Sequence, residues 1–102
     1  MKETFPPEAD HEIRLKRAKI RAWRRGMREM DLILGGYIDN HGASFSVEQL
    51  NTFELLLAHR DQDLYDWVSG RKQVQDTDVT ASEVALISEI RENWRVFEKN
   101  TP

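Results

Sequence analysis

The chain has 102 residues, a formal net charge of −3 and no cysteine, so we expect one domain without disulfides, a thiolate nucleophile or a cysteine-based metal site. No apolar run approaches the roughly 20 residues that a membrane span needs, and acids at Glu3, Glu8 and Asp10 argue against a transit or signal peptide. A chain of this size offers one good binding face but little room for an enclosed enzyme pocket, and we expect a soluble protein of a reducing, bacterial cytoplasm.

The cations are concentrated in one segment. Residues 14–28 hold eight cations and no acid, which contributes +8 to the total of −3 and leaves −11 for the rest of the chain. Such a cluster is typical either of a nucleic-acid footprint or of a patch that meets an acidic protein surface; its simplest interpretation is a solvated helix face. The eight cations are Arg14, Lys16, Arg17, Lys19, Arg21, Arg24, Arg25 and Arg28.

The N-terminal part predicts a disordered lead followed by a helix. Residues 1–9 contain two prolines and little apolar content, which predicts a disordered lead before a helical domain over residues 10–98. The first helix is predicted from Asp10, as its N-cap, to about Arg25. Its apolar positions at helical spacing are Ile13, Ile20 and Trp23, which we interpret as its buried stripe.

A second helical pattern follows Gly26, which interrupts the first. It ends near Asn40, where Gly42 is the expected terminator. The pair Gly35-Gly36 inside it weakens the helix intrinsically and leaves room for another helix to pack closely. The apolar positions are Met27, Met30, Ile33, Leu34, Tyr37 and Ile38.

Two capping boxes predict the starts of a third and a fifth helix. Ser46 with Gln49 opens a helix that ends near His59, and Thr80 with Glu83 opens the last one. The predicted buried positions are Val47, Leu50, Phe53, Leu56 and Leu57 in the third helix, and Val84, Ile87, Ile90, Trp94 and Phe97 in the fifth.

A short fourth helix is predicted between Asp61, a candidate N-cap, and Gly70, which would end it. Residues 71–79 are polar and are expected to form a loop. Because no strand pattern or internal repeat is present, the sequence predicts an all-α fold: a compact five-helix bundle that forms a monomer.

One segment departs from local helical rules. In the run Arg24-Arg25-Gly26-Met27-Arg28-Glu29-Met30-Asp31, a glycine inside a helix would cost about 1 kcal/mol relative to alanine. An arginine four residues before a glutamate is the weaker orientation of a pair worth roughly 0.2–0.5 kcal/mol. Such departures occur most often at functional or strained sites, although a helix boundary with an ion pair between Arg25 and Glu29 is the simpler interpretation.

This run, with its arginine-glycine-x-x-glutamate pattern, resembles the flavinylation factors, the small assembly factors of succinate dehydrogenase. A second block over residues 61–68, Asp-Gln-Asp-Leu-Tyr-Asp-Trp-Val, resembles another segment of that family, and the whole resemblance covers roughly residues 14–94. It implies a helper without enzyme activity that binds the flavoprotein subunit of succinate dehydrogenase, and that of the related fumarate reductase. The helper promotes covalent attachment of FAD to a histidine of that subunit. It therefore has no cofactor of its own, and the resemblance leaves direct binding of free FAD open.

The resemblance also implies where the partner binds. The glycine allows close approach, the glutamate and arginines make charge-assisted contacts, and the second block contributes to a shared surface. The predicted partner-binding residues are Arg24, Arg25, Gly26, Arg28, Glu29, Asp31, Asp63 and Trp67; no catalytic, cofactor-binding or metal-binding residue is predicted.

The alternative is a small nucleic-acid-binding or antitoxin-like regulator that uses the basic first helix. Trp23 would then be a base-stacking platform, but its spacing from Ile20 favours a core position, and the acidic remainder of the chain disfavours DNA. A calcium loop is not indicated, because the aspartates near Asp63 lack the glycine and terminal glutamate of such a loop. The three histidines show no ligand spacing.

Overall fold

The computed structural model describes residues 7–75 and 79–100, and in these ranges the chain is helical with no strand. This confirms the predicted all-α, five-helix fold. The elements are α1 (Pro7–Trp23), α2 (Arg28–His41), a short 3-10 helix η1 (Gly42–Ser44), α3 (Val47–Leu57), α4 (Asp61–Ser69) and α5 (Ala81–Asn100).

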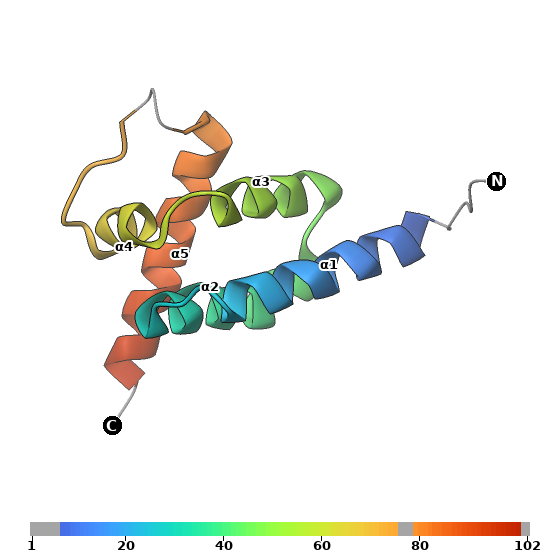
Figure 1. Ribbon diagram of the computed structural model, residues 1–102, viewed down its shortest axis with the longest axis horizontal. Helices are drawn as coiled ribbons and strands as arrows, with labels where there is room; N and C mark the ends of the chain where they lie inside the picture. Colours follow the sequence, from blue (N-terminus) through green and yellow to red (C-terminus); the bar gives the residue numbers. More distant parts are fainter. Residues whose placement is uncertain (1–6, 76–78, 101–102) are drawn as a thin grey trace.

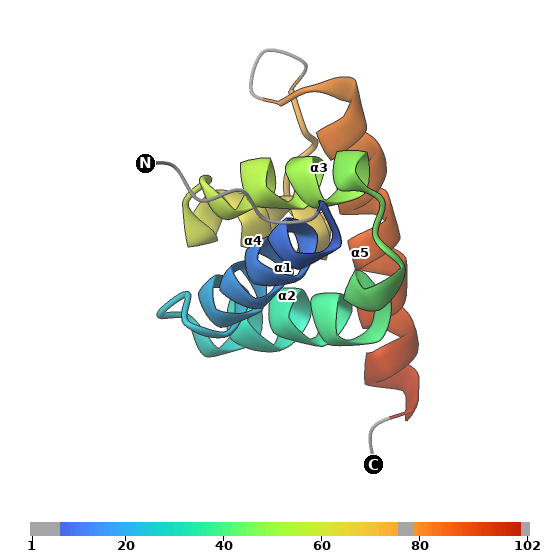
Figure 2. The same ribbon diagram turned by 90° about the vertical axis from the view of Figure 1, so that its right-hand side faces the viewer.

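Helix α1 packs against both α2 and α3, and α5 runs steeply across α2 and α3 (Figure 1). Seen from the side, α1 lies between α3 and α2 while α5 runs along one face of the group (Figure 2). Helix α4 packs against both α2 and α5. This arrangement leaves one long side of α1 without a neighbouring helix.

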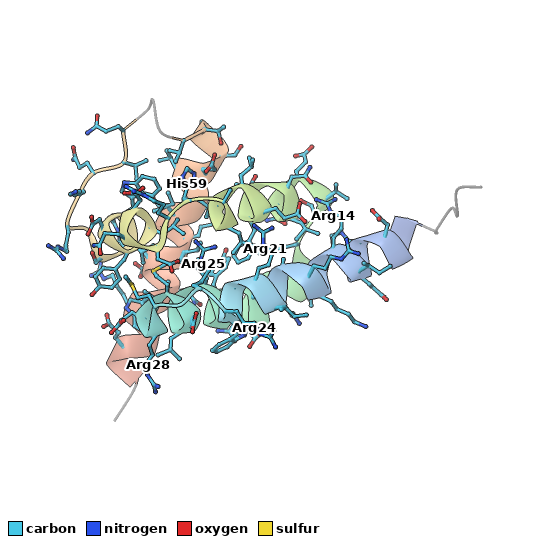
Figure 3. The ribbon with its side chains drawn as sticks, in the orientation of Figure 1. Arg14, Arg21, Arg24, Arg25, Arg28 and His59 are labelled. Carbon is cyan, nitrogen blue, oxygen red and sulfur yellow. The ribbon has the colours of Figure 1, made fainter. Side chains whose placement is uncertain are left out.

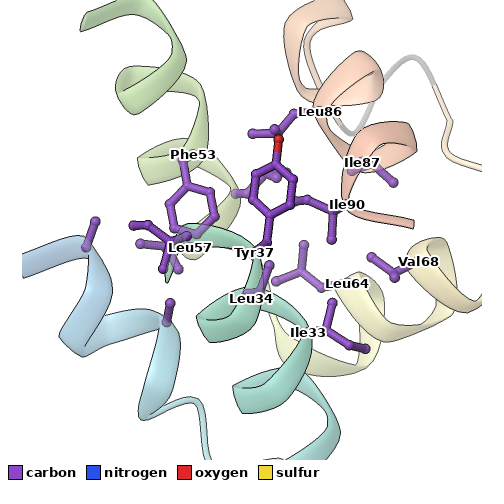
Figure 4. Close-up of a cluster of buried hydrophobic side chains, with 14 of the residues drawn as sticks. Ile33, Leu34, Tyr37, Phe53, Leu57, Leu64, Val68, Leu86, Ile87 and Ile90 are labelled. Carbon is purple, nitrogen blue, oxygen red and sulfur yellow. The ribbon is translucent and has the colours of Figure 1, made fainter. Parts of the chain in front are cut away.

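The core forms where α2, α3, α4 and α5 meet (Figure 4). Its largest side chains with almost no exposed surface include Phe53, Met30, Ile33, Leu34 and Ile90. The predicted inner face of α3 is confirmed except for Val47, the first residue of the helix, which is 55% exposed. On α5 the inner face is Leu86, Ile87 and Ile90, whereas Val84 and Trp94 are only partly buried. The side chain of Phe97 lies outside the described set.

Helix α1 buries different residues from those predicted. It begins at Pro7 rather than after Asp10, in keeping with the preference of proline for the first helical position, and it ends at Trp23. The predicted stripe is wrong: Ile13, Ile20 and Trp23 are 36%, 54% and 40% exposed. The buried positions are instead Ala18 and Ala22, with Leu15 packed beside them. Small side chains let α1 lie close to its neighbours. Residues 1–6 of the predicted lead lie outside the described residues.

Two glycines of α2 and η1 allow close packing against α1. A Cβ atom on Gly35 would lie 2.4 Å from the Trp23 ring, whose Nε1 donates to Asp39 at 3.2 Å, so the predicted close approach is confirmed there. Gly42 is the C-cap of α2, as predicted, but it does not form a left-handed turn, since its φ is −58°. A Cβ there would lie 3.1 Å from the Leu15 side chain, so this glycine provides space.

The local signals at the other helix ends are largely confirmed. Both capping boxes form: Gln49 N–H donates to Ser46 Oγ at 3.1 Å, and Glu83 N–H donates to Thr80 Oγ1 at 3.2 Å. Gly70 ends α4 with φ +83°. The N-cap of α4 is Arg60 rather than the following aspartate. Residues 71–75 of the predicted loop have no regular structure.

Candidate functional site

The connection between α1 and α2 is a tight turn around Gly26. Its φ is +95°, a region in which residues with a side chain are uncommon. A Cβ atom on Gly26 would meet nothing within 4 Å, so the glycine is explained by its backbone conformation. Gly26 interrupts the helix as predicted, but it lies outside both helices, and the cost of a glycine inside a helix does not apply.

Arg25 holds this turn against the α3–α4 connection. Its Nε donates to Asp61 Oδ1 at 2.6 Å, and its two Nη atoms donate to the carbonyl oxygens of Leu57 and His59, both at 2.5 Å. The side chain of Arg25 is 11% exposed. Carbonyls at the end of a helix lack partners inside it and favour a cation, so Arg25 completes the end of α3. The simpler interpretation of this run is right about the helix boundary but wrong about the ion pair with Glu29, because Arg25 lies in the turn and pairs with Asp61.

Asp31 fixes the same turn from the other side. The backbone N–H of Arg25 donates to Asp31 Oδ1 at 2.7 Å, which closes the chain across Gly26. Asp31 stands in the first turn of α2, where a carboxylate is stabilised by the helix dipole. Together, the hydrogen bonds of Arg25 and Asp31 fix the backbone conformation of the turn around the exposed Gly26.

The two sequence blocks that carry the family resemblance are therefore in contact. Arg25 and Asp61, 36 residues apart, join them directly. Sequence reasoning treated Asp61 as a helix cap and missed this pairing. Spacing along the chain contained no signal for it, because the pair forms only when the turn folds onto the end of α3.

The remaining residues of the first block are exposed charges. Arg24, Arg28 and Glu29 lie on the surface beside Gly26, and none of their side chains has an ion pair or hydrogen bond within the part of the chain that the structure describes. In Figure 3, Arg25 lies between the helices, whereas Arg28 points away from the body of the protein. The turn thus presents exposed charges of both signs whose side chains make no ion pair or hydrogen bond within the described residues.

The predicted residues of the second block differ in their surroundings. Trp67 is 6% exposed, and its ring meets the His59 ring edge-on at 5.2 Å, so it is mainly a core residue. Asp63 is partly exposed and lies 3.5 Å from Arg60 Nε. Both line an open cavity of about 570 Å³ together with His59 and Lys72. Their ion pair and ring contact are made with Arg60 and His59, and not with the Gly26 turn.

His59 and Glu83, which the sequence did not single out together, connect this region to α5. His59 Nε2 lies 2.8 Å from Glu83 Oε2, and the other oxygen of Glu83 accepts the Thr80 N–H at 3.2 Å. One glutamate therefore completes the capping box of α5 and holds the α3–α4 connection. The carbonyl of His59 accepts from Arg25, which links the Gly26 turn to α5 through three residues.

Two further properties of the described residues concern metal binding and the phenol of Tyr37. Within residues 7–75 and 79–100, no group of three or more side chains is placed to hold a metal ion, and none of the helices there is long and apolar enough to cross a membrane. Burial, together with a hydrogen bond of 3.1 Å to Glu89, raises the pKa of Tyr37 above its ordinary value. Its phenol is a protonated donor at neutral pH and not a base.

The chain is similar to proteins of one family over most of its length. A family described as "Flavinator of succinate dehydrogenase" matches residues 16–93. The FAD assembly factor SdhE of Acetobacter pasteurianus is 33% identical over 67 residues, 66% of this chain and 62% of the relative. The protein of the same name from Legionella pneumophila strain Lens is 42% identical over 50 residues, 49% of this chain and 63% of the relative. That of Colwellia psychrerythraea is 28% identical over 80 residues, 78% of this chain and 88% of the relative.

The first two matches cover less than two thirds of those relatives. No solved structure matches this chain.

Proposed function

The chain belongs to the family of flavinators of succinate dehydrogenase, and we propose that it is an assembly factor for the flavoprotein subunit of that enzyme. It binds this subunit and promotes covalent attachment of FAD to it. The observation that carries the proposal is the Gly26 turn, which is exposed, held by Arg25 and Asp31, and flanked by charges without internal partners. A surface of this kind suits a charged protein face better than a small molecule.

The proposed role requires no catalytic residue in this chain. The flavin and the histidine to which it becomes attached both belong to the partner, so the factor acts by stabilising the conformation in which they are aligned. Ideal alignment of two reacting groups can lower a barrier by about 7–11 kcal/mol. A rigid turn serves this role because a mobile one would lose part of the binding energy in becoming ordered.

The proposal extends to the following particulars. The factor acts as a monomer in the bacterial cytoplasm, holds no cofactor of its own, and also serves the flavoprotein subunit of fumarate reductase. Its relatives named FAD assembly factor SdhE support the role in FAD attachment. Equilibrium dialysis against free FAD separates a carrier of flavin from a helper that binds only the subunit, and we expect no retention of FAD.

Reconstitution tests the proposal directly. The purified flavoprotein subunit, prepared without flavin, is incubated with FAD with and without this protein, and covalent flavin is measured by absorbance after acid precipitation. We expect faster covalent attachment with the wild-type protein than without it. A Leu55→Ser variant, altered at an exposed residue of α3, serves as a control and should act like the wild type. Equal rates with and without the protein would contradict the proposal.

A further inference from the structure

We propose that the outward side of α1 is a docking surface for an acidic segment of the partner protein and continues the partner-binding surface of the Gly26 turn along the helix. This surface, called the α1 face below, consists of Ile13, Lys16, Arg17, Ile20 and Arg24. The inference rests on the proposed function for the identity of the partner. The evidence for the surface itself is the exposure, the charge and the arrangement of these five side chains.

The four members of the α1 face that lie in α1 share one side of the helix, and Arg24 follows directly after the helix end at Trp23. At 3.6 residues per turn, Ile13, Lys16, Arg17 and Ile20 fall within an arc of about 100°, opposite the side where Ala18 and Ala22 are buried against the core. No helix covers this arc in the described part of the chain (Figure 2). The α1 face is therefore fully available to another molecule.

The two apolar residues of the α1 face are not buried in the core. Ile20 is 54% exposed and Ile13 is 36% exposed, although isoleucine is among the residues most often buried. A single exposed isoleucine would need no explanation. Here two of them stand on one face, among cations, and this combination suits a partner that offers both apolar contact and negative charge.

The fold also distinguishes between the cations of α1. Arg14, which faces α3, is bound by Glu54 at 2.6 Å and by Asn51 at 2.5 Å. By contrast, Lys16, Arg17 and Arg24 are exposed, and their side chains make no hydrogen bond or ion pair to any residue that the structure describes. Arg14 therefore stabilises the packing of α1 on α3, whereas Lys16, Arg17 and Arg24 are available to contact a partner.

The arrangement of the α1 face favours a protein over a membrane. Helices that lie in a membrane surface keep apolar side chains on one side and cations on the other. On α1, Arg17 falls within about 60° of Ile13 and Ile20, so inserting the isoleucines would carry its guanidinium group into the apolar layer.

Nucleic acid fits less well, because a phosphate backbone would contact the cations but offers no apolar partner for Ile20. An acidic protein segment meets both requirements, since its carboxylates contact the cations while an apolar side chain packs on the isoleucines. Continuity supports the same partner as for the turn, because Arg24 belongs to both surfaces.

Binding of the purified flavoprotein subunit by variants of the α1 face tests the inference. The variants are Ile20→Ser and the pair Lys16→Gln with Arg17→Gln; the matched controls are Leu55→Ser on α3 and Arg95→Gln on α5, which are 50% exposed and 67% exposed in the side chain. We expect the dissociation constant to rise about five- to tenfold for Ile20→Ser and for the double variant. The effect of the double variant should shrink at high salt, whereas that of Ile20→Ser should persist. The controls should bind like the wild type.

The possible outcomes separate the inference from the proposed function. If the wild type binds the subunit and the α1-face variants bind it equally well, the inference is wrong and the proposed function stands. If the wild type does not bind the subunit, the proposed function fails and the inference loses its partner. A loss of binding to anionic vesicles or duplex DNA in these variants, with unchanged affinity for the subunit, would assign the face to a membrane or to nucleic acid and overturn the inference.

Discussion

Replacing Arg25 by alanine should strongly destabilise the fold, although the residue belongs to the motif expected to bind a partner. The guanidinium makes three hydrogen bonds at 2.5–2.6 Å and is 11% exposed. Breaking a fully buried ion pair costs about 3–5 kcal/mol. Because Asp61 is 21% exposed, water can compensate part of this loss, and we expect a decrease of about 2–4 kcal/mol in the free energy of unfolding. In a domain of this size, each kcal/mol lowers the melting temperature by about 4–8 °C.

Urea denaturation followed by far-UV circular dichroism measures this effect. Arg24→Ala is the matched control, since the neighbouring arginine is exposed and should change stability by no more than about 0.5 kcal/mol. Arg25→Lys should fall between the two, because lysine keeps the charge but cannot donate in three directions from one planar group. A double-mutant cycle with Asp61→Ala should give a coupling of about 0.5–3 kcal/mol. If Arg25→Ala is as stable as Arg24→Ala, the assignment of Arg25 to the inside of the protein is refuted.

Three further predictions follow from the turn, the α1–α2 contact and the core. Gly26→Ala should lower the free energy of unfolding by roughly 1–2 kcal/mol because Gly26 has a positive φ, and a bulkier substitution would impair the fold as well as binding. Glu29→Ala, at an exposed site, should keep its melting temperature within a few degrees, while its binding to the flavoprotein subunit should weaken. Gly35→Ala should lower the melting temperature because its Cβ would lie 2.4 Å from the Trp23 ring, and Trp23→Leu should restore part of the loss by removing that ring. Because the pKa of Tyr37 is raised by burial and a hydrogen bond, the stability it provides is complete below its ordinary value of about 10 and is lost as the pH rises further. Urea midpoints between pH 8 and 11 should therefore fall more steeply for the wild type than for Tyr37→Phe, and parallel curves would contradict this.

The local signals in the sequence predicted the helices well. Ser46 and Thr80 mark the starts of α3 and α5 because capping depends only on residues three positions apart, and Gly70 ends α4 for an equally local reason. The apolar period failed on α1, where Ala18 and Ala22 form the buried side. Alanine contributes little to an apolar pattern, and its burial depends on how closely a neighbouring helix approaches.

The candidate site was predicted in position but not in detail. The sequence located the two blocks, yet it assigned Arg25 and Asp31 to a partner, while the structure shows their hydrogen bonds inside the protein. The acceptors of Arg25 include two backbone carbonyls more than thirty residues away, and no side-chain pattern can indicate them. Arg24, Arg28 and Glu29 remain the predicted contacts of the turn.

Covalent flavin on the flavoprotein subunit in cells tests the central claim most directly. Extracts of a strain without this protein, and of the same strain carrying the wild type, Glu29→Ala or the control Leu55→Ser, are separated on a denaturing gel, and flavin fluorescence is compared with the amount of subunit. The account predicts that fluorescence per subunit is low without the protein, returns with the wild type and with Leu55→Ser, and stays low with Glu29→Ala. Full fluorescence in the strain that lacks the protein would contradict the account.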